Sequence, residues 1–213
     1  MQDSLANITD LSLRAENLRC ERGDVVLFEG LHVDLGPAEV LQVKGANGSG
    51  KTSLLRILCG LSQPDDGYVS WCGSDIQEYR AEYHRELVYV GHTNAIKAEL
   101  NVLENLQSSR AISGHPEGLS LQQVIARMSL EEHVDVPAGR LSSGQKRRLA
   151  FARLLSVQSR LWILDEPLNS LDADSRKKVC SCMMEHVRGG GSVILTSHED
   201  IDWQANVVKE VSL

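Results

Sequence analysis

The sequence reads GANGSGKT at residues 45–52 and continues directly into SLLRIL at residues 53–58. This octapeptide matches the phosphate-loop pattern G-x-x-x-x-G-K-[S/T] at every specified position. The segment before it, residues 40–43, is short, apolar and β-branched, and the apolar residues after it recur at helical spacing. A strand, a glycine loop and a helix are therefore expected in this order, which is the arrangement that binds nucleoside triphosphates.

The residue types of the loop suit a triphosphate. Glycines let the backbone turn its N–H groups inward at a helix N-terminus and so form a concave anion site. We expect Lys51 to reach the β- and γ-phosphates and the Thr52 hydroxyl to bind Mg²⁺. A glycine-rich turn that contains a lysine by chance is the alternative, and the register of strand, loop and helix disfavours it. The residues expected to bind ATP here are Gly45, Ala46, Asn47, Gly48, Ser49, Gly50, Lys51, Thr52 and Ser53.

Length and composition limit the class of protein. A chain of 213 residues with 42% hydrophobic and 24% charged residues is typical of one soluble globular domain with a real core. The formal net charge of −7 argues against a nucleic-acid partner. The five cysteines form no C-x-x-C pair, so we expect neither a zinc site nor a disulfide framework. Residues 1–10 are expected to be a polar leader without a secretion signal, and no apolar run approaches the ~20 residues that span a bilayer, so no direct membrane insertion is expected.

The chain alternates strands and helices around one helical segment. Residues from about 99 to 140 have helical periodicity and no convincing strand, whereas the alternating pattern continues on both sides. A single domain over residues 11–213 is therefore expected, with residues 99–140 as a helical insertion. We expect strands at 11–18, 25–28, 31–35, 40–43, 68–71, 87–90, 161–164 and 193–196, and helices at 79–86, 145–155 and 174–187 besides the one after the loop.

Two carboxylates follow the apolar strand expected at residues 161–164. α/β proteins place their ligand sites at the carboxyl ends of such strands. Asp165 is therefore expected to hold Mg²⁺, and Glu166 to polarise the attacking water. An acidic turn after a strand is common and alone indicates no site. In a chain that already carries a phosphate loop, it indicates the metal-binding and catalytic carboxylates.

The sequence LSSGQ at residues 141–145 is the second diagnostic element. Alone it predicts a helix start with a serine cap. It also resembles the L-S-G-G-Q signature of the ATP-binding-cassette (ABC) ATPases, with Ser143 in place of the first glycine. Together with the phosphate loop and the acidic strand end, this resemblance extends over about residues 11–202. It implies an α/β P-loop NTPase core of the ABC type, with an antiparallel β subdomain and a helical insertion subdomain.

The resemblance also implies a dimer and further site residues. In this family two cassettes enclose two nucleotides, so Ser142, Ser143, Gly144 and Gln145 are implied to bind the ATP held by the other subunit. The residues at 170–172 match the loop that crosses to the partner. His198 matches the histidine that contacts the γ-phosphate and is implied to be catalytic beside Glu166.

Two departures from the family pattern stand out. The family usually has a glutamine after the strand equivalent to residues 87–90, whereas here the stretch reads GHTNAIK at 91–97. His92, Thr93 or Asn94 is the candidate substitute, and the sequence does not choose among them. The family also tends to stack an aromatic residue on adenine; here Arg22 stands near the expected place and can stack its guanidinium plane on the base.

Several softer features resemble the ATP-binding subunits of cytochrome c maturation systems. They are the short length, the segment at 91–97, LWILDEP at 161–167 and the glycine turn before VILTSH at 193–198. This resemblance implies a homodimer paired with integral membrane permease subunits at the cytoplasmic face of the inner membrane, where ATP hydrolysis drives handover of haem towards apocytochrome c. The alternatives are another small ABC transporter, a non-transport ABC ATPase, and, more remotely, a small-molecule kinase or a non-catalytic nucleotide-binding module.

Overall fold

The computed structural model describes residues 12–114, 118–197, 201, 203 and 207–213 of the chain. Its elements follow in chain order: β1 (Leu13–Arg22), β2 (Val25–Leu35), β3 (Glu39–Lys44), α1 (Lys51–Leu58), β4 (Asp66–Trp71), β5 (Ser74–Asp75), α2 (Arg80–Glu86), β6 (Leu87–Val90), α3 (Val102–Ser113), α4 (Leu121–Arg127), the 3₁₀ turns η2 (Glu131–His133) and η3 (Ala138–Arg140), α5 (Ser143–Leu155), β7 (Leu161–Leu164), α6 (Ala173–Arg188), β8 (Ser192–Thr196) and β9 (Val207–Ser212).

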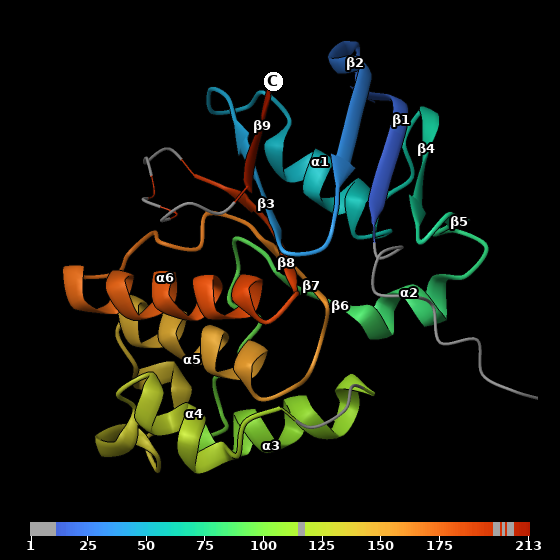
Figure 1. Cartoon of the computed structure of the whole chain (residues 1–213). Helices are drawn as coiled ribbons and strands as arrows, with labels where there is room; N and C mark the ends of the chain where they lie inside the picture. Colours follow the sequence, from blue (N-terminus) through green and yellow to red (C-terminus); the bar gives the residue numbers. More distant parts are fainter. Residues whose placement is uncertain (1–11, 115–117, 198–200, 202, 204–206) are drawn as a thin grey trace, which may run out of the picture.

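Two sheets organise the molecule (Figure 1). The larger is parallel, in the order β6-β7-β8-β3-β9, and the smaller is antiparallel, in the order β2-β1-β4-β5. The strands β3, β8 and β7 are parallel neighbours, so their carboxyl ends lie at the same end of the sheet. The loop after β3 and the carboxylates after β7 therefore emerge close together, and the site lies there.

Helix α1 lies between the two sheets (Figure 1), and one apolar cluster joins its residues to both of them. Leu54, Leu55, Ile57 and Leu58 are fully buried. Each such side chain stabilises the fold by about 1.5–3 kcal/mol relative to an exposed one. The helix that carries the phosphate loop is therefore held rigidly against the core.

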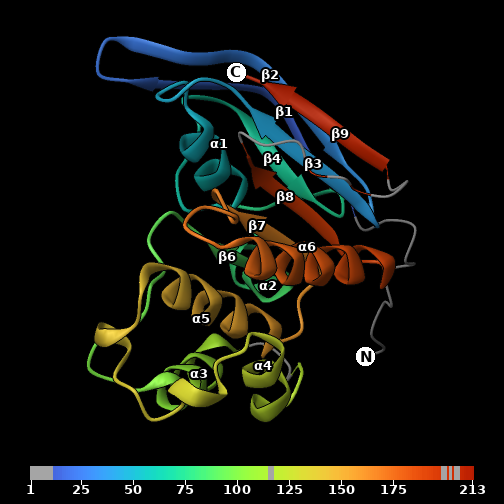
Figure 2. The ribbon, with the colours of Figure 1, turned by 90° about the vertical axis from the view of Figure 1, so that its left-hand side faces the viewer.

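The opposite face of the parallel sheet is covered by α5 and α6, with α3 and α4 in a further layer beyond them (Figure 2). A second apolar cluster runs through all of these helices. The starts of α3, α4 and α5 are marked by side chains: each helix has a capping box, formed by Asn101 with Glu104, Ser120 with Gln123, and Ser142 with Gln145. Between residues 99 and 140 the described part of the chain is helical or irregular, as its periodicity predicts.

Two strand predictions were wrong. The strands expected at 25–28 and 31–35 are one strand, β2, that passes through Gly30 with a φ of +65°. Leu18 pairs with Leu31 and Cys20 pairs with Phe28, so β2 has one residue more than β1 between these pairs. Gly30 thus sits in a β-bulge and does not end the strand. Similarly, β1 continues to Arg22 and does not stop at residue 18.

The C-terminal strand β9 was not predicted. It adds to the edge of the parallel sheet beside β3, with Glu39 opposite Val207 and Lys44 opposite Ser212. Its sequence, VVKEVS, places Lys209 and Glu210 in its middle, and such charged residues are common on edge strands. The local pattern therefore lacks the apolar run by which the central strands were recognised.

Candidate nucleotide-binding site

The phosphate loop joins β3 to α1 through glycines with positive φ. Gly45, Gly48 and Gly50 have φ of +152°, +84° and +103°. A Cβ on Gly50 would lie 3.0 Å from the Leu27 Cβ, so side chains of β2 pack directly against the loop. The loop needs glycine at these positions because of its left-handed backbone and, at Gly50, because of a close neighbour.

Lys51 begins α1 and folds back over the loop. It is only 7% exposed, and its Nζ donates hydrogen bonds to the carbonyl oxygens of Gly45 (2.8 Å) and Ala46 (2.9 Å). The hydroxyl of Ser49 is buried and has no hydrogen-bond partner in the described part of the chain. The loop therefore presents a cation and an unsatisfied hydroxyl, both of which suit a phosphate.

Asp165 follows β7 and is only 2% exposed. One of its carboxylate oxygens accepts a hydrogen bond from the Thr52 hydroxyl, and the other accepts one from the Thr196 hydroxyl, both at 2.8 Å. The structure thus brings Thr52 and Asp165 together, as expected for two ligands of one metal ion. Thr196, at the end of β8, was missed; its place at the carboxyl end of a strand beside β7 is the signal that could have found it.

Glu166 has a φ of +47°, a left-handed conformation that is unfavourable for a residue with a Cβ. Its backbone N–H donates to the Thr196 hydroxyl at 2.7 Å, and its carboxylate accepts a hydrogen bond from the Asn169 side chain. The strained backbone turns this residue towards the loop, where it lines a pocket of about 240 Å³. The pocket is lined by Leu27, Asn47, Gly48, Gly50, Lys51, Thr52, Ser53 and Glu166.

The LSSGQ segment forms the start of α5. The Ser142 hydroxyl accepts from the Gln145 backbone N–H at 3.2 Å, and the Gln145 side chain accepts from the Ser142 N–H at 2.8 Å and contacts His133. A Cβ on Gly144 would lie 3.0 Å from the Ser170 carbonyl oxygen. The residues that line the pocket come from β2, the phosphate loop, α1 and the end of β7, and none of those in the described part of the chain belongs to the LSSGQ segment.

Comparison with known proteins identifies the family. The profile described as ABC transporter matches residues 28–169, which include the phosphate loop, the LSSGQ segment and the acidic strand end. The chain belongs to the ABC transporter family.

Among the relatives of this ABC protein is the "Cytochrome c biogenesis ATP-binding export protein CcmA" of Methylococcus capsulatus, 48% identical over 92% of this chain and 95% of the relative. A protein of the same name from Nitrosococcus oceani is 44% identical over 89% of this chain and 87% of its own length. Both the family resemblance and the resemblance to the cytochrome c maturation subunits are confirmed.

Solved structures confirm the fold class. A putative ABC transporter ATP-binding protein from Pyrococcus furiosus superposes with a TM-score of 0.78 at 22% identity and covers 93% of this chain and 96% of its own. An ATP-binding subunit of an ABC transporter gives a TM-score of 0.77 at 24% identity, covering 87% of this chain and 79% of its own. At these identities the structures show the fold alone. Within the described residues, no helix is both long and apolar enough to cross a membrane.

The remaining ABC site predictions differ in how far the structure describes them. Arg22 is exposed next to the turn between β1 and β2, where its Nη1 donates to the Glu21 carbonyl oxygen at 3.0 Å. Leu27 is the residue of this hairpin that lines the pocket in the described part of the chain. His198 lies outside the described residues. Arg22 and His198 stay predictions.

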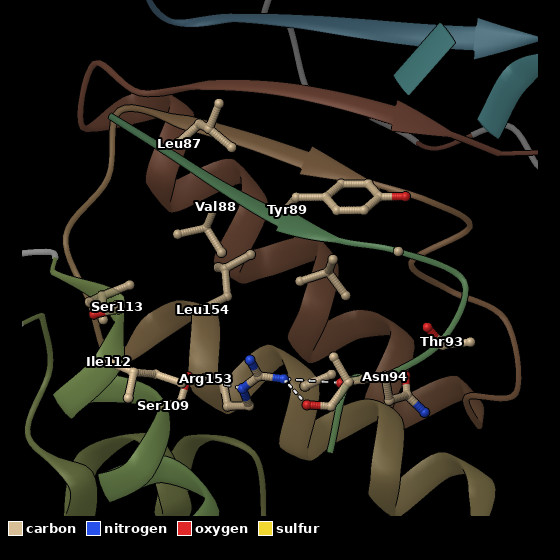
Figure 3. A pocket seen from close by; sticks show the side chains of 15 residues that line it. Leu87, Val88, Tyr89, Thr93, Asn94, Ser109, Ile112, Ser113, Arg153 and Leu154 are labelled. Atoms are coloured by element: carbon tan, nitrogen blue, oxygen red, sulfur yellow. Dashed lines mark hydrogen bonds between the residues drawn. The ribbon is translucent and has the colours of Figure 1, made fainter. Parts of the chain in front are cut away.

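The loop after β6 borders a second pocket of about 210 Å³ (Figure 3). Thr93 and Asn94 line it, and His92 and Thr93 are exposed, whereas Asn94 is half-buried. Figure 3 shows β6 on one side of this pocket, α3 with Ile112 on another, and Arg153 of α5 reaching the loop. Behind the loop lies Arg147, a buried arginine of α5.

Proposed function

We propose that this chain is the ATP-hydrolysing subunit of a membrane export complex in cytochrome c biogenesis, the process named in its relatives. Membership of the ABC family supports ATP hydrolysis, and 48% identity over 92% of the chain to a protein of that name supports the process. The observation that supports hydrolysis at this site is the hydrogen bond between Thr52 and Asp165 next to the phosphate loop. Glu166 lines the pocket over the same loop.

Thr52 and Asp165 are the residues that we propose hold Mg²⁺. Both present oxygen atoms, which are the ligands this ion prefers, and their oxygens already lie 2.8 Å apart. When bound, the metal neutralises charge on the β- and γ-phosphates. Thr196 orients Asp165 through the second carboxylate oxygen and so leaves the first one directed at Thr52.

Lys51 binds the phosphates, and Glu166 activates the attacking water. The Lys51 ammonium exchanges the neutral carbonyls of Gly45 and Ala46 for the more strongly accepting phosphate oxygens when ATP enters. Glu166 accepts a hydrogen bond from a water molecule and directs its oxygen at the γ-phosphorus. The new P–O bond forms as the bond to the bridging β,γ-oxygen breaks, which yields ADP and phosphate. We assign His198 to the γ-phosphate in the same step.

The complete site needs two copies of the chain. The phosphate-loop pocket has no lining residue from Ser142, Ser143, Gly144 or Gln145 in the described part of the chain. The exposed serines stand at the N-terminus of α5, where backbone N–H groups and the helix dipole favour a negative charge. We therefore propose that they bind the γ-phosphate of ATP held by a second copy in a homodimer.

The pocket of Figure 3 is the proposed docking site for an integral membrane permease subunit at the cytoplasmic face of the inner membrane. It combines an apolar wall from β6 with polar groups of Thr93 and Asn94. Ile112 at its rim is 74% exposed, which is unusual for a large apolar side chain and typical of a contact surface.

The test compares Glu166→Gln with wild type, with Lys51→Ala and with the exposed matched control Glu78→Gln. Glu166→Gln should retain ATP affinity, form a stable dimer with Mg·ATP and lose at least ~100-fold in kcat, because only water activation is removed. Lys51→Ala should lose ATP affinity, and Glu78→Gln should match wild type. Normal hydrolysis by Glu166→Gln would remove Glu166 from the reaction.

The same Glu166→Gln protein tests the partner. Tagged protein is incubated with detergent-solubilised membranes, with and without Mg·ATP, and co-purified chains are identified. Recovery of small integral membrane proteins of cytochrome c biogenesis supports the proposal. An unrelated permease would instead make this a subunit of another ABC transporter, and soluble partners alone would favour a non-transport ABC ATPase.

A further inference from the structure

Arg147 lies in the second turn of α5 and is only 4% exposed. Its guanidinium donates to three successive backbone carbonyls at the end of β7, those of Asp165 (2.6 Å), Glu166 (2.8 Å) and Pro167 (3.2 Å). It also donates to the carbonyl oxygen of Gly91 at 3.0 Å and to the Asn94 side-chain oxygen at 3.1 Å. One buried side chain thus binds two loops that are remote in the sequence.

The three carbonyl contacts fix the backbone from which the two site carboxylates project. Glu166 keeps a left-handed φ of +47°, a conformation that costs about 1–2 kcal/mol for a residue with a Cβ. Such a conformation persists only where its surroundings hold it. Arg147 holds the peptide groups on both sides of Glu166, because it binds the carbonyls of residues 165 and 166.

The other two contacts reach the loop that borders the pocket of Figure 3. A second arginine of α5 fastens the same loop: Arg153 donates to the carbonyls of Asn94 (3.1 Å) and Ala95 (2.6 Å) and to the Ser109 hydroxyl (3.0 Å). Ala95 has a φ of +47°, so this loop is also held in a left-handed conformation. A group that enters the pocket and moves the loop will act on Arg147 through Asn94.

We propose that Arg147 is a positioning residue that couples the 91–95 loop to Glu166, with Asn94 as its side-chain contact in that loop. The inference rests on the proposed ATPase function and deepens it: occupancy of the pocket is read out at Glu166 as a change in the rate of hydrolysis, with nucleotide affinity little changed.

The chemistry of the side chain explains why arginine is needed. A guanidinium offers five N–H donors in a rigid plane, and here all three nitrogens donate. A lysine keeps the charge but has three donors at one point, so it cannot reach both loops. Arg147→Lys therefore removes the bridge and keeps the buried cation.

The experiment measures kcat for ATP hydrolysis and, in a Glu166→Gln background, the affinity for a fluorescent ATP analogue. Arg147→Lys should lower kcat about tenfold or more and change affinity less than about threefold, since lost hydrogen bonds of this kind reach that size. Asn94→Leu should lower kcat by about three- to tenfold, and Asn94→Asp, which keeps an acceptor, should restore it. The double variant Arg147→Lys/Asn94→Leu should be no slower than Arg147→Lys alone.

The matched control is Arg148→Lys. Arg148 lies next to Arg147 in α5 but donates to the carbonyls of Met128 and Ser129, away from the catalytic strand. It should leave kcat within about twofold of wild type, once the folded fraction has been set by thermal denaturation. Equal losses in the Arg147 and Arg148 variants would reduce Arg147 to a structural residue.

Two further outcomes would overturn the coupling. Multiplicative effects of Arg147→Lys and Asn94→Leu would show that the two residues act separately, and a loss of affinity without loss of kcat would place Arg147 in nucleotide binding. Failure of the wild-type protein to hydrolyse ATP would instead refute the proposed function itself, so the two failures are distinguishable.

Discussion

Gly45 and Gly48 stand three residues apart in the phosphate loop but have different surroundings. A Cβ on Gly45 would lie 2.5 Å from the Ser49 hydroxyl oxygen and 2.9 Å from the Leu213 carbonyl oxygen, whereas a Cβ on Gly48 would meet nothing within 4 Å. Both have positive φ, so an added Cβ strains the backbone in either case. The Leu213 N–H donates to the Lys44 carbonyl oxygen at 3.0 Å, so this C-terminal residue lies beside the start of the loop.

Gly45→Ala should therefore cost more than Gly48→Ala. We expect about 1 kcal/mol of lost stability for Gly48→Ala, from strain alone, and about 2–4 kcal/mol for Gly45→Ala, from strain and overpacking together. Urea denaturation of the two variants measures the difference, and ATP affinity should fall further for Gly45→Ala. Equal destabilisation by the two substitutions would contradict the close packing at Gly45.

The sequence pattern located the residues of this site to different degrees. Thr52 and Asp165 were both expected to hold Mg²⁺, because Thr52 ends the phosphate-loop motif and Asp165 follows an apolar strand, and their side-chain oxygens lie 2.8 Å apart. Thr196 and Arg147 carry no motif of their own. Their roles depend on strand register and on the packing of α5 against β7, which arise only when distant segments meet.

At the scale of elements, α6 is fastened to the parallel sheet by a stacked pair. The ring of His186 lies on that of Trp162 in β7, with centroids 3.9 Å apart and planes 5° from parallel. A Cβ on Gly191 would lie 2.3 Å from ring atoms of His186, so the glycine turn before β8 also packs directly against the imidazole. Burial lowers the pKa of His186 from 6.5 to about 4, and His186 is therefore neutral in the folded protein at neutral pH.

This buried histidine predicts a pH dependence of stability. Its pKa is lower in the folded than in the unfolded state, so the unfolded chain binds more protons, and stability falls as the pH decreases from about 6.5 to 4. The loss from this one group is at most about 3 kcal/mol. His186→Phe keeps the stack and removes the proton site, so its unfolding free energy should change less over this interval. Parallel curves for wild type and variant, from urea denaturation at successive pH values, would refute the assignment.

Elements with a strong local pattern were predicted well, and the others were not. The helices α1, α5 and α6 begin after Gly50, Ser142 and Asp172, and the strands β3, β7 and β8 are largely buried apolar runs. β2 was divided at Gly30 because a glycine in a strand and a glycine in a turn look alike in sequence. β9 was missed because it is an edge strand, held by β3 more than by its own composition.

At the scale of the whole molecule, the two halves of the proposed active site are separate in the described part of the chain. The pocket over the phosphate loop holds Lys51 and Glu166, while Ser142 and Gly144 start a helix that packs against the other face of the sheet. We therefore expect a single copy to bind ATP without the second set of donors. The ABC resemblance predicts this division from the five residues of the LSSGQ segment, whereas composition and periodicity do not indicate it.

Mixing two inactive variants tests this division. Lys51→Ala removes the phosphate-binding lysine of the loop and leaves the LSSGQ start of α5 intact. Gly144→Asp leaves the loop intact and places a negative charge where the γ-phosphate of the partner's ATP should bind. In a mixed dimer, the loop of the Gly144→Asp chain faces the intact signature of the Lys51→Ala chain, so one of two sites is complete. Random pairing makes about half of all dimers mixed, and activity should recover to about a quarter of the wild-type value. The measurement is ATPase activity against mixing ratio at fixed total protein. A maximum at equal amounts supports the composite site, and activity that stays at the level of the separate variants at every ratio would mean that each chain works alone or that no mixed site forms.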